Sequence, residues 1–203
     1  MKMNLPNRLT VLRLCLVPVF VVILLISDAL WAEIAGLAIF CIAAYTDHLD
    51  GKIARRDHLV TDFGKFLDPL ADKFMVIGAM LVLLFKSMTD EPMNRIFCTV
   101  FFVGLLIVIM RELAVTSMRL VVSGSSGIVI AANMLGKIKT VSQIVCVIAC
   151  FAERIFYGHI EALAFLQDYL PLSTVTTAVM AFFTLLSGIR YIKDYWKYLD
   201  PEK

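Results

Sequence analysis

Six long apolar stretches dominate this 203-residue chain and constrain its fold more than any other feature. A helix needs about 20 mainly apolar residues to cross the hydrocarbon core of a bilayer. The chain is 60% hydrophobic and 18% charged, whereas water-soluble domains are usually about 45–50% apolar with about 25% charge. We therefore predict an all-α, polytopic membrane protein with about six transmembrane helices, over Thr10–Ser27, Ala32–Ala54, Asp68–Phe85, Ile96–Leu120, Ile138–Phe156 and Leu172–Ile192.

The rest of the composition narrows the class of protein further. The polar segments between the stretches are too short to fold alone, so residues 1–203 are expected to form a single membrane domain. A formal net charge of only +2 predicts no nucleic-acid partner. All five cysteines lie in apolar runs, which indicates buried hydrophobic side chains rather than a disulfide or metal framework. The first stretch contains Arg13 and no small-residue cleavage site, so we interpret it as a span rather than a signal peptide.

The distribution of lysines and arginines predicts how the chain is oriented. Short cytoplasmic loops of membrane proteins carry an excess of these residues. If the N-terminus is cytoplasmic, all of the 19 basic residues except Lys86, Arg95 and Arg154 lie on the cytoplasmic side. Both termini are therefore predicted to be cytoplasmic. The opposite side receives those three bases together with the acids Asp28, Glu33, Asp90, Glu91, Glu153, Glu161 and Asp168.

Four aspartates gather at the cytoplasmic ends of the second and third stretches, where ionisable residues are costly and indicate a function. Asp47 and Asp50 are three residues apart, and Asp68 and Asp72 are four apart, so each pair lies on one helix face. Clustered carboxylates repel one another unless cations lie between them, and ligands that are all oxygen favour Mg²⁺, Mn²⁺ or Ca²⁺. We predict two divalent cations, Mg²⁺ or Mn²⁺, an arrangement that recurs in phosphoryl-group displacement. The active site is then expected at the cytoplasmic end of the bundle.

Small and basic residues between the two aspartate pairs suit a phosphate ligand. Gly51 and Ala54 remove bulk beside the carboxylates, which lets a ligand approach the backbone. Arg55 offers a forked donor for phosphate oxygens. Gly64 is expected to give the connecting loop a tight turn or room for a ligand.

Asp68 has a second reading, because it directly precedes Pro69. An aspartate followed by proline is typical of a helix N-cap with proline at the first helical position. That reading explains Asp68 alone and does not account for the other three aspartates, so both interpretations stay open at this point.

The segment between residues 47 and 72 also carries a family signature. It resembles that of the CDP-alcohol phosphotransferases at all eight fixed positions. Four segments look like the bacterial phosphatidylglycerophosphate synthase branch of that family, although beyond about Ala152 the likeness is in hydropathy only. The signature reads Asp47-x-x-Asp50-Gly51-x-x-Ala54-Arg55, eight residues, and Gly64-x-x-x-Asp68-x-x-x-Asp72. The four segments are Pro6-Asn7-x-x-Thr10-x-x-Arg13, Phe66-Leu67-Asp68-Pro69-Leu70-Ala71-Asp72-Lys73, Arg111-Glu112 and Gly136-Lys137-x-Lys139-Thr140.

The resemblance implies a membrane enzyme that transfers the phosphatidyl group of CDP-diacylglycerol to sn-glycerol 3-phosphate and releases CMP. In the family the last aspartate of the signature, here Asp72, is the proposed general base for the acceptor hydroxyl. Direct in-line attack is favoured, since no Ser, Cys or His with a partner base stands beside the carboxylates. Asn7 and Thr10 are expected on the nucleotide side together with Gly51, Ala54, Arg55 and Gly64. The family further implies a homodimer surrounded by lipid in the bacterial cytoplasmic membrane.

Glycerol 3-phosphate is a dianion and needs cations beyond the metal site. Arg111 and Arg119 lie eight residues apart on the fourth stretch, roughly 80° apart around a helix. Lys137 and Lys139 enter the fifth stretch from the same side. These four residues are predicted to bind the acceptor phosphate. The alternative is that they are anchors that reach toward lipid head groups.

Two other functions remain open from the sequence. A sister transferase would use inositol phosphate, serine or choline as acceptor, and the basic residues favour a phosphorylated one. A divalent-cation transporter would also carry acids in its spans. Transporters, however, place their sites near the bilayer midplane between inverted repeats, whereas these acids lie at helix ends and no repeat is seen.

Overall fold

The computed structural model describes residues 4–56, 61–89, 94–126, 134–159 and 170–196, and the regular structure in these ranges is helical. Each predicted stretch falls on one long helix, so the all-α prediction is confirmed within the described residues. The helices are α1 (Leu5–Ile26), α2 (Leu30–Arg56), α3 (Asp62–Thr89), α4 (Arg95–Ser126), α5 (Met134–His159) and α6 (Pro171–Tyr195).

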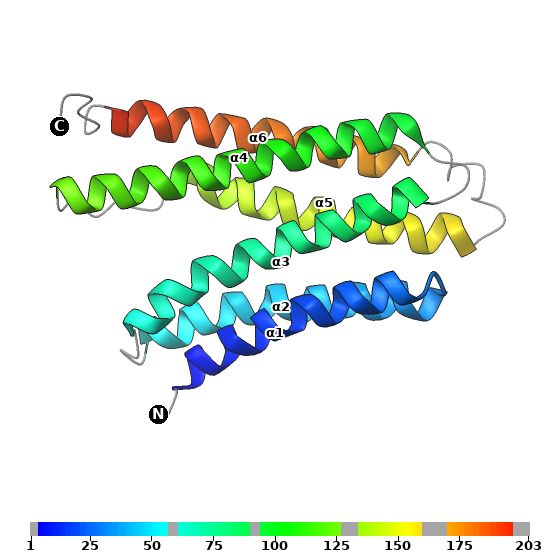
Figure 1. Cartoon of the computed structure of the whole chain (residues 1–203), viewed down its shortest axis with the longest axis horizontal. Coiled ribbons are helices and arrows are strands. Elements are labelled where there is room, and N and C mark those ends of the chain that lie inside the picture. Colours follow the sequence, from blue (N-terminus) through cyan, green and yellow to red (C-terminus); the bar gives the residue numbers. More distant parts are fainter. Residues whose placement is uncertain (1–3, 57–60, 90–93, 127–133, 160–169, 197–203) are drawn as a thin grey trace.

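The helices run up and down in one bundle, with both ends of the chain at the same end of it (Figure 1). Helix α3 lies between the α1 and α2 pair and the remaining helices, and it contacts α1, α2, α4 and α5. Helix α6 packs on α4 and α5. Each of the first five helices contributes a large, fully buried side chain to the core, namely Phe20, Phe40, Met80, Phe101 and Phe151.

The outer surface of the bundle is apolar, as expected of helices that face lipid. Within the described residues, five helices are long and apolar enough to cross a membrane, α1, α2, α4, α5 and α6. Helix α3 is different because Asp72 and Lys73 on one side and Lys86 on the other leave only residues 74–85 uncharged between them. The five apolar helices indicate a polytopic membrane protein, and a sixth span through α3 stays a prediction.

The start of α3 corrects two expectations. Helix α3 begins at Asp62, so Pro69 lies inside the helix and Asp68 is not its N-cap. The cap is Thr61, whose Oγ1 accepts a hydrogen bond from the backbone N–H of Gly64 at 3.1 Å, as a threonine at the N-cap commonly does. Gly64 therefore lies in the first helical turn and not in a loop. A third expectation is also wrong, because Cys15 is exposed on α1.

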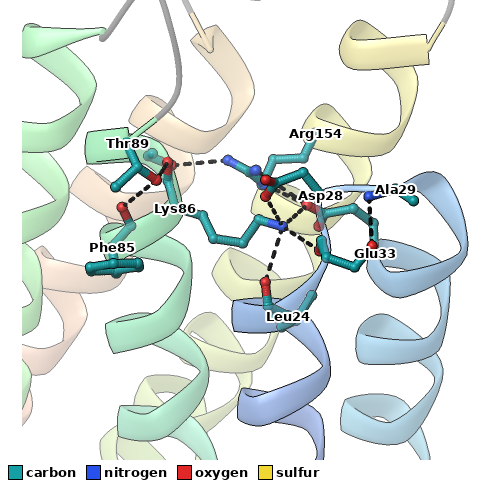
Figure 2. A network of polar contacts seen from close by, with 10 residues as sticks. Leu24, Asp28, Ala29, Glu33, Phe85, Lys86, Thr89 and Arg154 are labelled. Atoms are coloured by element: carbon teal, nitrogen blue, oxygen red, sulfur yellow. Dashed lines mark hydrogen bonds and ion pairs between the residues drawn. The ribbon is translucent and has the colours of Figure 1, made fainter.

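A network of charged groups closes the end of the bundle opposite the chain termini (Figure 2). The Lys86 ammonium, on a side chain only 2% exposed, lies 2.9 Å from carboxylate oxygens of both Asp28 and Glu33. It also donates to the carbonyl oxygens of Leu24 and Ser27. The hydrogen bond from Lys86 to Asp28 and the positive charge of Lys86 lower the pKa of Asp28, which lies in the connection between α1 and α2, so its carboxylate stays ionised to a lower pH than an ordinary aspartate.

Helix α5 ties the same end to the rest of the bundle. Arg154 lies 3.2 Å from the same Glu33 oxygen that binds Lys86, and its Nη1 donates to Ser87 of α3. The carboxylate of Glu153 accepts hydrogen bonds from the backbone N–H groups of Leu172 and Ser173 at 2.8 and 2.7 Å. It thereby satisfies donors that are otherwise unpaired at the start of α6. Of the residues that the sequence assigned to the side opposite the termini, Asp28, Glu33, Lys86, Glu153 and Arg154 thus gather at one end of the bundle, while Asp90, Glu91, Glu161 and Asp168 lie outside the described residues.

Candidate active site

The face of α1 that carries Arg13 meets Asp47, the first aspartate of the signature. The Arg13 side chain is completely buried. Its Nη1 donates to Asp47 Oδ1 at 2.6 Å, and its Nε donates to the carbonyl oxygen of Ala43, one turn earlier on α2, at 3.2 Å. A buried guanidinium with two such partners fixes the rotamer of Asp47, because charge-assisted hydrogen bonds are among the strong ones.

One turn before Arg13, Thr10 makes the matching contact to the second aspartate pair. Its hydroxyl donates to Asp68 Oδ1 at 2.7 Å and lies 3.2 Å from the carbonyl oxygen of Pro6. Thr10 and Arg13 are three residues apart and so share one face of α1. This single face therefore holds one carboxylate from α2 and one from α3, at the end of the bundle where the chain begins.

Asn7 lies one turn further toward the start of α1 and fastens it to the first turn of α3. Its side-chain amide and the hydroxyl of Thr61 are hydrogen-bonded, with distances of 3.0 and 3.1 Å. A Cβ atom at Gly64 would lie only 2.8 Å from Asn7 Oδ1, so a side chain there would displace the Asn7 amide and disturb its hydrogen bonds to Thr61. In this structure Asn7 and Gly64 serve the contact between helices. Thr61 was missed by sequence reasoning, although a threonine directly before an aspartate is typical of an N-cap.

Asp72 faces a second cluster, built between α3, α4 and α5. Its centre is Glu112 of α4, whose Oε1 lies 2.5 Å from Lys139 Nζ and 3.2 Å from Arg111 Nη1. Arg111 continues to α6, where its Nη2 donates to the hydroxyl of Ser187 at 2.8 Å. Asp72, Glu112 and Lys139 line one small cavity together with Lys73, Gln143, Val76, Ile77 and Val108.

The cations predicted to bind the acceptor divide into two groups. Arg111 and Lys139 are drawn together by the carboxylate of Glu112. Arg119 and Lys137 are exposed on α4 and α5, and neither lines the cavity. Sequence reasoning assigned no role to Glu112, although an acid inside an apolar helix is itself a signal of function.

The remaining predicted site residues lie in the last part of α2. Asp50, Gly51, Ala54 and Arg55 fall within that helix, but their side chains lie outside the part of the chain whose side chains the structure describes. Their predicted roles as a metal ligand and as diphosphate contacts therefore stay predictions.

A divalent cation fits the signature aspartates by the chemistry of the donors. Carboxylate oxygens are the ligands that Mg²⁺ and Mn²⁺ prefer, and Thr10 and Arg13 hold Asp68 and Asp47 toward the same face of α1. Among the side chains that the structure describes, no three Asp, Glu, His or Cys groups form a cluster able to hold a metal ion. Asp47, Asp68 and Asp72 are therefore not close enough in this structure to form a three-ligand site by themselves. The set of four ligands, with Asp50, stays a prediction.

Comparison with known proteins gives the family. The family model of the CDP-alcohol phosphatidyltransferases matches residues 3–187. A protein of Bacillus subtilis (strain 168) named CDP-diacylglycerol–glycerol-3-phosphate 3-phosphatidyltransferase is 39% identical, over 97% of this chain and 97% of its own. A protein of that name from Rickettsia bellii is 31% identical, over 96% of this chain and 97% of its own. A protein of Arabidopsis thaliana that carries the same name followed by the number 2 is 33% identical, over 97% of this chain and 81% of its own. The chain belongs to the CDP-alcohol phosphatidyltransferase family.

Proposed function

We propose that this chain transfers the phosphatidyl group of CDP-diacylglycerol to sn-glycerol 3-phosphate, which yields phosphatidylglycerophosphate and CMP. The observation that carries the proposal is the full-length similarity to relatives named for this reaction, 39% identical in the Bacillus subtilis protein. The cluster of Arg111, Glu112 and Lys139 supports a phosphorylated acceptor, because Glu112 brings two cations together and, with Lys139, lines the cavity that Asp72 also lines.

Four carboxylates would hold the metal ions in this reaction. Asp47, Asp50, Asp68 and Asp72 would bind two divalent cations, Mg²⁺ or Mn²⁺, with Gly51, Ala54 and Arg55 beside the diphosphate. When bound, such ions neutralise charge on the diphosphate and stabilise the departing CMP. Arg13 and Thr10 act on this centre through Asp47 and Asp68, since they fix the two carboxylates from α1.

The chemistry proposed for the chain itself is a proton transfer coupled to one displacement. Asp72 takes the proton from the attacking hydroxyl of the acceptor, and the hydroxyl oxygen forms a bond to the phosphorus that carries diacylglycerol. The bond from that phosphorus to the oxygen shared with CMP breaks, and CMP leaves with the electron pair. Arg111 and Lys139 hold the acceptor phosphate, and Glu112 fixes the positions of both cations.

The proposed setting is the cytoplasmic membrane of a bacterium, with both termini and the site facing the cytoplasm. Both chain ends lie at the end of the bundle where α1 holds Asp47 and Asp68, and the basic residues favour that end as the cytoplasmic one. A homodimer stays a prediction.

The acceptor is tested directly with purified protein. We expect CMP release from CDP-diacylglycerol with Mg²⁺ or Mn²⁺ and glycerol 3-phosphate, and little release with inositol phosphate, serine or choline. Turnover with inositol phosphate and none with glycerol 3-phosphate would replace the proposed acceptor. No CMP release with any of these acceptors would refute the proposed reaction.

Removal of the Arg111 guanidinium tests the acceptor site. Arg111→Ala is expected to raise KM for glycerol 3-phosphate by about tenfold or more, because a charge-assisted contact to phosphate is worth about 1.5–3 kcal/mol. KM for CDP-diacylglycerol should change far less. Arg190→Ala is the matched control, since Arg190 is exposed on α6 and pairs with Asp194. An equal rise of KM for both substrates would argue that Arg111 only supports the fold.

A further inference from the structure

Gln143 carries a hydrogen-bond donor that the described structure leaves unused. Its side chain lies on α5, one turn after Lys139, and is only 2% exposed. Among the described residues, its amide nitrogen Nε2 has no hydrogen-bond partner. Buried polar groups are nearly always paired, and an unpaired one costs about 1–3 kcal/mol. Where such a donor also faces a cavity, it can bind a partner that is not part of the protein.

The place of Gln143 shows what kind of partner this is. Gln143 lines the cavity that Asp72, Lys73, Glu112 and Lys139 also line. The polar neighbours already have partners, since Lys139 pairs with Glu112 and Lys73 donates to Thr116 of α4. The cavity has a volume of about 10 Å³, about the room that one water needs. Beside Gln143 it has room for one hydroxyl group, and the rest of a bound acceptor would lie outside it.

We infer that Gln143 Nε2 donates a hydrogen bond to the hydroxyl of the acceptor that does not react, the one on the carbon between the reacting carbon and the phosphate-bearing carbon. The inference rests on the proposed function. Lys139 binds the phosphate end and Asp72 accepts the proton of the terminal hydroxyl, so the middle hydroxyl lies between them. Four residues, about 6 Å of helical rise, separate Lys139 from Gln143, so the two long side chains can reach a phosphate and a hydroxyl on adjacent carbons.

This contact makes Gln143 a specificity-determining residue. A site that hydrogen-bonds a substrate hydroxyl discriminates against an analogue that lacks it, because the buried donor is then left unpaired. The matching analogue is 3-hydroxypropyl phosphate, which keeps the phosphate and the terminal hydroxyl of glycerol 3-phosphate and lacks only the middle hydroxyl. The wild-type protein is expected to prefer glycerol 3-phosphate in kcat/KM by about 10- to 100-fold.

The test compares both acceptors on the full-length protein. In Gln143→Leu, kcat/KM for glycerol 3-phosphate should fall by about 10- to 100-fold while that for 3-hydroxypropyl phosphate changes by less than about threefold, so the preference disappears. Gln143→Met serves as a second variant of similar length if the leucine variant does not fold. Thr184→Val is the matched control, because Thr184 Oγ1 of α6 is also buried without a partner among the described residues and does not line this cavity.

Two outcomes would overturn the inference. One is a wild-type protein that uses both acceptors equally well. The other is a Gln143 variant that loses activity equally toward both, which would assign the amide to a fixed water or to packing. Failure of the proposed function itself looks different, since the wild-type protein would then release no CMP with glycerol 3-phosphate.

Discussion

Replacement of Asp72 by asparagine is expected to lower phosphatidyl transfer by at least about 10³-fold. General base catalysis alone contributes about 10²–10⁴-fold, and the same carboxylate is a predicted metal ligand. Asparagine has nearly the same shape as aspartate, but it cannot accept the proton of the acceptor hydroxyl. The fold should persist, because Asp72 is only partly buried and α3 is held by many other contacts.

The measurement is CMP release together with binding of CDP-diacylglycerol. Asp72→Asn should lose the first and largely retain the second, whereas a variant that had lost its fold would lose both. Asp194→Asn is the matched control, an exposed aspartate on α6 that pairs with Arg190. Activity of Asp72→Asn within about tenfold of the wild type would exclude this residue as the general base.

The second large effect is on stability and lies at the opposite end of the bundle. Lys86→Met is expected to lower the free energy of unfolding by about 3 kcal/mol, since removing one partner of a buried ion pair leaves the other charge poorly compensated. Glu33 is the buried group left behind, and among the described residues it would keep the ion pair with Arg154, at 3.2 Å. Methionine preserves most of the length of the lysine side chain, so the loss reports on charge rather than on packing.

Unfolding in detergent by heat or denaturant measures this effect. Lys193→Met, an exposed lysine of α6, should unfold like the wild type. The double variant Lys86→Met with Glu33→Gln should recover part of the loss, because the uncompensated carboxylate is then gone. CMP release per folded molecule should stay unchanged in Lys86→Met, in contrast to Asp72→Asn. A Lys86→Met protein as stable as the wild type would contradict the role of this network.

Sequence patterns predicted the helices well because the apolar stretches and their charged ends set where a helix can lie in lipid. Their errors came from local signals. The Asp68-Pro69 pair is typical of a helix start, yet α3 begins at Asp62 because Thr61 caps it. The start of α3 is therefore set by the Thr61 cap and not by Pro69, which lies inside the helix.

For the candidate site, the sequence predicted the residue types and the helix faces on which they lie, but not which side chains contact one another. The spacing of the aspartates places them on faces of α2 and α3, yet no periodicity tells that Arg13 meets Asp47 and Thr10 meets Asp68. For Lys137 and Lys139, the sequence itself already indicated that the two side chains do not share one site. Residues two apart on a helix point about 200° apart, and accordingly Lys139 is buried at Glu112 while Lys137 is exposed.

The contacts of α1 with Asp47 and Asp68 show that the signature segment alone does not make up the site. A fragment that began at α2 would contain every residue of the signature from Asp47 to Asp72. It would lack the hydroxyl of Thr10 and the guanidinium of Arg13 that hold two of the carboxylates in place. The signature thus contains the carboxylates proposed to act in the reaction, whereas a helix outside the signature fixes the orientation of two of them.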